Sequence, residues 1–429
     1  MPHSVAISTF QTISQLAGQP AVHRAFQWFH LQEPQLREWH RQTAAIPAPP
    51  FGEGARADWV AGQFDMLGLD DVSIDDCGNA VGWLRGRRDS GRERAAFRPC
   101  TLFSAHLDTV FPAEAIGMPV QDGSRLSIPG ASDNSAGITA LLAVAAAVRS
   151  AGVKPGSDIL FAGNVGEEGE GNLRGMRYLF TESRIAPRIR SAVILDGAGT
   201  DTIVTQGLGS KRFHVRVTGP GGHSWTDAGT PNPILILANA LTTIGNLEFP
   251  SSPRTTWNVG RLEGGTSVNS IPQQAEAWID TRSTDTAVLL RLEEQIVAAV
   301  AGAVGTANDA MNGRTSANHG HGPIQFEMKT IGERPAAKLA EDAPILSILH
   351  SVDRHLGIQS RAGTASTDAN IPLSLGIEAV SIGSGGRGGG VHTRQEWFDA
   401  TGRDLALRRI LLLLLALAQT QTETQAEME

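Results

Sequence analysis

Two adjacent glutamates follow an apolar run in the middle of the chain. The run Ile159 to Phe161 is typical of a buried strand, and it leads through a glycine-containing turn to Glu167 and Glu168. Neighbouring side chains of an extended segment point to opposite sides, so one glutamate can face a metal ion while the other faces a substrate. An isolated Glu-Glu pair is more often a solvated turn, because charged residues are mostly exposed. The interpretation therefore depends on which other reactive side chains lie at strand ends.

A histidine and an aspartate end a second apolar run. His106 and Asp108 follow the segment Thr101 to Ala105, which is typical of a buried parallel strand. Residues two apart in an extended segment face the same side, so His106 can bind a metal ion while Asp108 orients its imidazole ring. On its own, such a pair is more often a buried histidine with a structural hydrogen bond.

Three further side chains of this kind lie where a helix is expected to begin or a strand to end. Asp133 precedes an apolar helix expected over 138–148, where it could cap the helix or bridge two metal ions. Asp196 ends another apolar run, and His392 follows the run 379–382 and a glycine-rich loop. Open α/β sheets bind ligands outside the carboxyl ends of their strands. We therefore expect these side chains to converge on one site.

The glycine-rich loop before His392 fits no phosphate-binding pattern, because no Lys-Ser/Thr pair follows it. Such a loop can instead offer backbone N–H groups to a carboxylate. We expect Gly389 and Gly390 to bind the substrate in this way.

The elements around these residues predict an α/β protein. We expect a catalytic domain with a mixed, mostly parallel sheet flanked by helices, interrupted by an inserted α+β domain. Between 207 and 325 the pattern changes to strand, helix, strand, strand, helix, beginning with the alternating segment 211–218. The catalytic domain is therefore expected over 1–206 and 326–429.

Two outlying segments also carry predictions. We expect helical structure from Thr9 to Thr43 and a polar, glycine-rich loop from Ala307 to Gly322. The histidines of that loop, His319 and His321, are interpreted as solvated rather than as metal ligands.

The composition excludes several classes of function. The net charge is −8 and no lysine- or arginine-rich block stands out, so nucleic-acid binding is not indicated. Cys77 and Cys100 form neither a disulfide framework nor a CxxC pair, so His, Asp and Glu would have to hold any metal ion. The N-terminus has no signal-peptide pattern, and the most apolar run, 410–418, is too short to span a bilayer. We therefore expect a cytoplasmic protein that does not bind membranes.

Seven short motifs occur along the chain in this order: S-A-H-L-D-T-V, G-A-S-D-N-S-A-G, G-E-E-G, L-D-G, G-P-G-G-H-S, S-V-N-S-I-P…D-T-R and G-G-V-H-T-R-Q-E. Together they resemble the M20 family of dinuclear zinc metallopeptidases, which includes carboxypeptidase G, peptidase T, aminoacylase and acetylornithine deacetylase. The resemblance covers the chain from about Pro47 onward. It implies that the inserted domain is a lid that commonly dimerises, so we expect a homodimer through this domain.

The resemblance also implies a set of metal ligands. Two divalent ions, zinc or else cobalt or manganese, would be held by five residues: His106, Asp133, Glu168, Asp196 and His392. Asp133 would bridge the two ions, Glu167 would be the general base, and Asp108 would support His106. Many relatives have a second acidic residue after the bridging aspartate, where this chain has Asn134. Oxygen and nitrogen ligands without thiolate suit these three metals.

Three residues of the inserted domain match residues that bind substrate in relatives. His223 matches a lid histidine that reaches the neighbouring subunit's site in dimeric members and helps to hold the tetrahedral intermediate. Asn269 and Arg282 match residues that bind the substrate's carboxylate, for which the planar guanidinium of arginine is well suited. An arginine in this place could equally form a surface salt bridge.

The expected reaction is metal-dependent hydrolysis of an amide bond in a short peptide, by a metal-bridging water with Glu167 as the general base. The protein would then be a di- or tripeptidase or a carboxypeptidase-type exopeptidase. An N-acyl amino acid deacylase would use the same catalytic residues and is the main alternative. Carbamoyl-amino-acid hydrolysis is disfavoured because the motif around His392 is peptidase-like. A non-catalytic metal-binding relative is a distant alternative, because all five ligands and Glu167 are present.

Overall fold

The structure is a computed structural model, and it describes residues 2–87, 98–249, 252–312 and 322–428. The chain divides into two compact units, Met1–Gly207 with Lys338–Glu429 and Leu208–Ala337. The second unit extends beyond the expected boundary at residue 325, because strand β14 (Gln325–Arg334) pairs with β9 (Gly209–Thr218) inside that unit.

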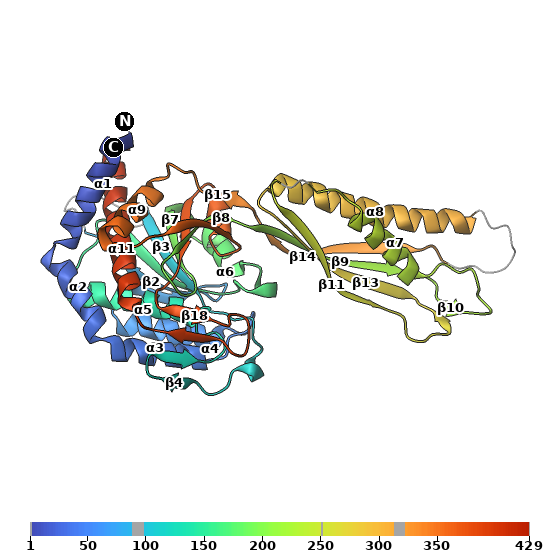
Figure 1. Cartoon of the computed structure of the whole chain (residues 1–429), viewed down its shortest axis with the longest axis horizontal. Helices are drawn as coiled ribbons and strands as arrows, with labels where there is room; N and C mark the ends of the chain where they lie inside the picture. Colours follow the sequence, from blue (N-terminus) through green and yellow to red (C-terminus); the bar gives the residue numbers. More distant parts are fainter. Residues whose placement is uncertain (1, 88–97, 250–251, 313–321, 429) are drawn as a thin grey trace. The chain divides into compact units, whose positions relative to one another are not determined.

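A nine-stranded sheet forms the centre of the first unit (Figure 1). Its order is β1-β2-β6-β3-β7-β17-β8-β15, and β16 also pairs with β8. The strands are β1 (Asp70–Ile74), β2 (Ala80–Leu84), β3 (Cys100–His106), β6 (Asp158–Asn164), β7 (Ile189–Leu195), β8 (Thr202–Gly207), β15 (Ala337–Lys338), β16 (Arg361–Ala365) and β17 (Glu378–Ile382). The neighbours β6-β3-β7-β17 run parallel, whereas β1, β2 and β8 pair antiparallel. The predicted α/β class with a mixed sheet flanked by helices is confirmed.

Helices cover the central strands, which are buried along their length. Every residue of β3 and β6 is buried, as parallel strands in α/β proteins are. Helix α5 packs against β3, β6 and β7, and α4 packs against β1, β2 and β6. The helices of this unit are α1 (Pro2–Ala17), α2 (Pro20–Leu31), α3 (Glu33–Ala45), α4 (Gly54–Met66), α5 (Ser135–Ala151), α6 (Arg174–Arg177), α9 (Pro344–Leu356), α10 (Asn370–Ser374) and α11 (Arg403–Met428).

The two ends of the chain lie in neighbouring helices, α1 and α11 (Figure 1). The segment expected as helical from Thr9 to Thr43 is divided among α1, α2 and α3. Pro20 and Pro34 stand in the first turns of α2 and α3, where the missing N–H of proline costs no helical hydrogen bond. The apolar run 410–418 is buried within α11. Among the described residues, no helix is long and apolar enough to cross a membrane.

A small four-stranded sheet also belongs to the first unit. Its order is β18-β19-β5-β4, and all of its pairs are antiparallel. The strands are β4 (Val120–Asp122), β5 (Arg125–Ser127), β18 (Arg387–Gly389) and β19 (Trp397–Asp399). The sheet places the segment that follows residue 127 beside the segment that precedes residue 397.

The second unit is an antiparallel sheet with two helices on one face (Figure 1). The sheet order is β11-β13-β9-β14, and β10 pairs with β12 in a separate two-stranded sheet. The elements other than β9 and β14 are β10 (Gly222–His223), α7 (Pro233–Gly245), β11 (Thr255–Gly264), β12 (Ser270–Ile271), β13 (Gln274–Ser283) and α8 (Thr286–Asn312). Helix α8 extends to Asn312, so the prediction of a loop is wrong for residues 307–312. His319 and His321 lie outside the described residues.

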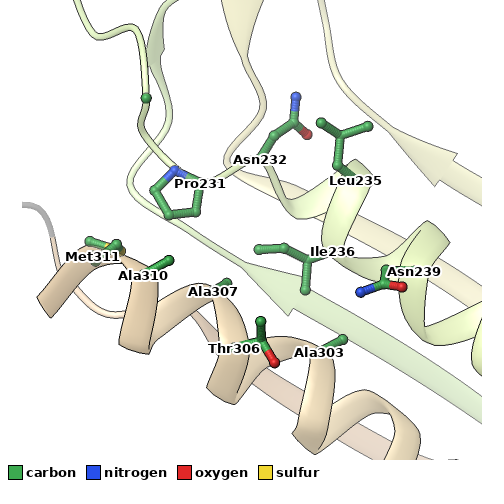
Figure 2. A pocket seen from close by; sticks show the side chains of 11 residues that line it. Pro231, Asn232, Leu235, Ile236, Asn239, Ala303, Thr306, Ala307, Ala310 and Met311 are labelled. Atoms are coloured by element: carbon green, nitrogen blue, oxygen red, sulfur yellow. The ribbon is translucent and has the colours of Figure 1, made fainter. Parts of the chain in front are cut away.

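A pocket of about 380 Å³ lies between α7 and α8 in the second unit (Figure 2). Its lining is mostly apolar, with Asn232, Asn239 and Thr306 as the polar side chains. None of the lining residues is His, Cys, Asp or Glu. The pocket therefore presents no metal ligand and no acid–base group.

Candidate metal centre

Five side chains of the first unit gather at the carboxyl end of its parallel strands. His106 ends β3, Glu168 and Asp196 follow β6 and β7, Asp133 precedes α5, and His392 follows β18. Within the described part of the chain they form two groups that could each hold a metal ion, His106–Asp133–Asp196 and Asp133–Glu168–His392. One ligand atom from each residue of a group lies within 4.8 Å of the others. The structure thus brings together all five of the expected ligands.

Asp133 is common to both groups, and its two carboxylate oxygens face different histidines. Oδ1 lies 3.0 Å from His106 Nε2, and Oδ2 lies 3.2 Å from His392 Nε2. Oδ1 is buried and has no hydrogen-bond partner among the described residues. Asn134, not Asp133, caps helix α5, because the Asn134 Oδ1 accepts from the N–H of Gly137 at 3.1 Å. The Asp133 carboxylate therefore has no capping role and is arranged as a bridge between two cations would be.

The imidazole of His106 is oriented by the main chain of Asp108. His106 Nδ1 is 3.0 Å from the Asp108 carbonyl oxygen, so Nδ1 is the donor to that oxygen and Nε2 is the ring nitrogen that faces Asp133 and could bind a metal ion. The Asp108 carboxylate is 3.6 Å from Nδ1 and accepts from the N–H groups of Glu167 at 2.9 Å and Glu168 at 2.7 Å. Asp108 thus holds the ring through its carbonyl and the two glutamates through its carboxylate.

The excess of carboxylates changes the pKa of both histidines. Burial acts to lower the pKa of His106, but the neighbouring carboxylates of Asp108, Asp133 and Asp196 raise it well above its ordinary value. Asp133 and Glu168 raise the pKa of His392 to about 10. Carboxylates that attract protons to this degree also attract divalent cations, which would displace the protons from both rings.

Buried residues outside the ligand set hold the segments that carry the ligands. Arg56 is fully buried and donates to the carbonyl oxygens of Leu107 at 2.8 Å and Ile46 at 3.0 Å. Leu107 lies between His106 and Asp108 in the sequence, so this hydrogen bond holds the main chain that carries both residues. His40 Nε2 is 2.6 Å from the carbonyl oxygen of Ala131, and burial lowers the pKa of His40 to about 3. A neutral His40 therefore donates to the loop that carries Asp133.

A buried acid–amide pair lies at the end of β6. Asn164 Nδ2 donates to Asp368 Oδ2 at 2.6 Å, and Asp368 is fully buried. Burial raises the pKa of Asp368 to about 7. Sequence reasoning missed Asp368, Arg56 and His40 as parts of this site. The one signal was the polar run 366–370 between predicted elements, and it does not single out Asp368.

Asn134 joins two of the ligand segments. Its Nδ2 donates to the Leu195 carbonyl oxygen at 2.8 Å, and its Oδ1 accepts from the N–H of Gly197 at 3.2 Å. Asp196 lies between these two partners. The amide at this position therefore connects the segment of Asp133 to that of Asp196, a task that needs both a donor and an acceptor.

The two glycines expected to bind substrate are required by packing. A Cβ atom on Gly389 would lie 2.8 Å from the ring of Trp397. Gly390 has φ +66°, a left-handed conformation that L side chains rarely adopt. Their expected contact with substrate stays a prediction.

The three expected substrate-binding residues of the inserted domain lie in the second unit, in two separate places. His223 is in β10 and pairs with Ser270 of β12, next to Asn269. The His223 Nδ1 accepts from the N–H of Trp225 at 3.1 Å, so its other ring nitrogen carries the proton and is an exposed donor. Arg282 lies at the far end of β13, where its Nε is 2.9 Å from Asp280 Oδ2.

The donor set fits divalent metals that accept oxygen and nitrogen ligands. It consists of two imidazoles and three carboxylates without thiolate, which suits zinc, cobalt or manganese. The unsatisfied Oδ1 of Asp133 gives the fit an independent basis, because a buried polar atom normally has a partner.

Comparison with known proteins relates parts of the chain to peptidases. The model of the peptidase dimerisation domain matches residues 208–306, and that of peptidase family M28 matches residues 91–212. A probable carboxypeptidase of Emericella nidulans is 28% identical over 264 residues, which are 57% of this chain and 61% of that protein. The match therefore spans less than two thirds of the fungal relative.

Solved structures share the fold over nearly the whole chain. A tripeptidase from Staphylococcus aureus has a TM-score of 0.70 at 21% identity, covering 90% of this chain and 99% of its own. A dinuclear metal-binding peptidase of the M20 family from Bacillus subtilis has a TM-score of 0.63 at 15% identity, covering 90% and 98%. These matches relate the chain to peptidases. The resemblance to the M20 family is confirmed.

Proposed function

We propose that this protein hydrolyses an amide bond in a short peptide and that it uses two divalent ions, with zinc as the expected metal. The observation that carries this proposal is the Asp133 carboxylate, whose oxygens lie 3.0 and 3.2 Å from the rings of His106 and His392. The names of the matched proteins, a carboxypeptidase and a tripeptidase, support a peptide as the substrate.

Glu167 is the side chain assigned to proton transfer. Two bound metal ions would polarise the scissile carbonyl and lower the pKa of a nearby water. Glu167 is not a member of either ligand group, is 5% exposed, and has its N–H held by Asp108 at 2.9 Å. Its carboxylate takes a proton from the attacking water and passes it to the leaving amine.

The substitution Glu167→Gln tests this assignment. Turnover of a dipeptide by the zinc- or cobalt-loaded protein is expected to fall by about 10²–10⁴-fold, while metal content stays unchanged because Glu167 is not a ligand. Glu170→Gln is the matched control, since Glu170 is exposed on the turn that follows. A Glu167→Gln enzyme with wild-type turnover would rule out this mechanism.

A substrate panel distinguishes the peptidase from the deacylase. It contains dipeptides, tripeptides, N-acetyl amino acids, and the same compounds with an amidated C-terminus. Hydrolysis of the peptides alone supports a peptidase, whereas hydrolysis of the acyl compounds alone identifies a deacylase. Loss of turnover on amidation would support recognition of the free carboxylate, for which Arg282 is the proposed partner.

The positions of His223 and Arg282 support a homodimer. The β10–β12 strand pair that carries His223 adjoins the Gln274 end of β13, where the Gly219 N–H donates to the Gln273 carbonyl oxygen at 2.8 Å. Arg282 lies at the other end of this strand, roughly 25 Å away at the usual rise per residue. A dipeptide spans only about 7 Å, so the His223 and Arg282 side chains of one chain cannot both contact it. We propose that His223 of the partner subunit completes the site.

The cytoplasmic location stays a prediction.

A further inference from the structure

Glu396 lies where a strand pair opens into two segments that carry metal ligands. Strand β5 leads into the loop of Asp133, and the loop of His392 leads into β19. The two strands pair, with Trp397 opposite Ser127. The N–H of Ile128 then donates to the Glu396 carbonyl oxygen at 3.1 Å. Beyond this point the strand pairing ends, and each segment carries one of the expected metal ligands, Asp133 or His392.

The Glu396 carboxylate is hydrogen-bonded to the loop that carries Asp133. It is 1% exposed and accepts three hydrogen bonds from main-chain N–H groups. Oε2 accepts from Gly130 at 2.9 Å, and Oε1 accepts from Ser132 and Asp133 at 2.8 Å each. Because a buried carboxylate is costly without such donors, this arrangement holds the loop of residues 130–133 in one position.

A second contact joins the same two segments. A Cβ atom on Gly388 would lie 2.2 Å from Ser132 Oγ, so the main chain of β18 packs directly on the loop of Asp133. His392, four residues further on, has φ +63°. A left-handed conformation in a residue other than glycine persists only where the surroundings enforce it.

We propose that Glu396 is a positioning residue for metal binding, which couples the bridging ligand Asp133 to the segment of His392. Glu396 and Asp133 are 263 residues apart in the sequence, and no direct covalent constraint brings their segments together. Glu396 does not touch a metal ion. It acts through the main chain of Asp133 and through the turn that leads to His392. This inference deepens the proposed function and rests on it.

The test is the affinity of the full-length protein for Co²⁺ and Zn²⁺, measured by competition with a chelator and by the visible absorption of bound Co²⁺. Glu396→Gln keeps the size of the side chain but turns an amide donor toward main-chain N–H groups. We expect both dissociation constants to rise by about 10–100-fold, as when other supporting residues of metal sites are changed. The Co²⁺ spectrum should change, because Asp133 would no longer be held in place.

Asp353→Asn is the matched control, since Asp353 is a buried carboxylate of the same unit that pairs with Arg409 at 2.6 Å. This variant should lose thermal stability but keep wild-type metal affinity. If Glu396→Gln does not fold, Glu396→Asp provides the test, because it keeps the charge but cannot reach all three N–H groups.

Three outcomes are distinguishable. A folded Glu396 variant with wild-type affinity and an unchanged Co²⁺ spectrum overturns the inference, even if its melting temperature falls. Weakened metal binding in the Glu396 variant together with wild-type affinity in the Asp353 control supports it. A wild-type protein that binds neither ion refutes the proposed function itself, whatever Glu396 does.

Discussion

Two regions of this protein are rich in charged side chains. In one region the charges are buried and bound by main-chain groups, and in the other they are exposed and form ion pairs. At the candidate metal centre of the first unit, Asp108 is fully buried and bound by two main-chain N–H groups, and Arg56 is fully buried and donates to carbonyl oxygens. On the open face of the second unit's sheet, each acid faces a cation. Arg261 pairs with Glu263, and Lys329 pairs with Glu327 at 3.1 Å.

The comparison separates charges that position a site from charges that cover a surface. Burying a charge is costly and is compensated only by well-placed partners, so the metal centre depends on its geometry. Exposed pairs gain little because water screens them. The same residue types should therefore give large effects in the first region and small effects in the second.

The largest effect is expected for Asp108→Asn. The amide can accept from only one of the two N–H groups of Glu167 and Glu168 and turns a donor toward the other. We expect the free energy of unfolding to fall by about 1.5–3 kcal/mol and the turnover of the metal-loaded protein to fall by about 10–100-fold. Urea unfolding and peptide hydrolysis measure the two effects. An unchanged variant would show that the Asp108 carboxylate does not hold these glutamates.

An intermediate effect is expected in the pH dependence of stability contributed by His40. Its pKa is about 3 in the folded protein against an ordinary 6.5, so below pH 6.5 the unfolded chain binds a proton that the folded protein does not. Stability therefore falls as the pH falls through this window, by about 1.4 kcal/mol per pH unit.

Urea unfolding at pH 7.5 and pH 5.5 measures this contribution. His40→Gln should lose about 1.4 kcal/mol less than the wild type between these two conditions. His30→Gln is the control, because His30 is exposed. Equal losses in the wild type and His40→Gln would mean that His40 also titrates normally in the folded protein.

The smallest effect is expected for Glu327→Gln in the second unit. The Glu327 side chain is 52% exposed and pairs with the 60% exposed Lys329. Removing this charge should change the free energy of unfolding by less than about 1 kcal/mol, and 1 M salt should reduce the difference further. A loss of unfolding free energy as large as that of Asp108→Asn would contradict the conclusion that buried charges matter more than exposed ones.

Much of the fold and the placement of the ligands followed from local patterns. Apolar runs such as Thr101 to Ala105 are long enough for buried strands and too short for helices. Because parallel strands end at one edge of a sheet, His106, Glu168 and Asp196 could be expected to meet. The roles of adjacent residues were harder to distinguish from the sequence. Asp133 and Asn134 are both ordinary helix caps, and only the structure shows that Asn134 has that role.

The sequence by itself was enough to find the resemblance to a peptidase family, because the reactive residues at each strand end lie close together in the chain. It also determined the donor set, since two cysteines leave only His, Asp and Glu as ligands. The tertiary structure decided which buried groups hold the ligands in place. Glu396 meets the N–H of Asp133 across 263 residues, and Arg56 meets the carbonyl of Leu107 across 51. These partners are main-chain atoms, which every residue carries, so no side-chain pattern in the sequence could have marked them.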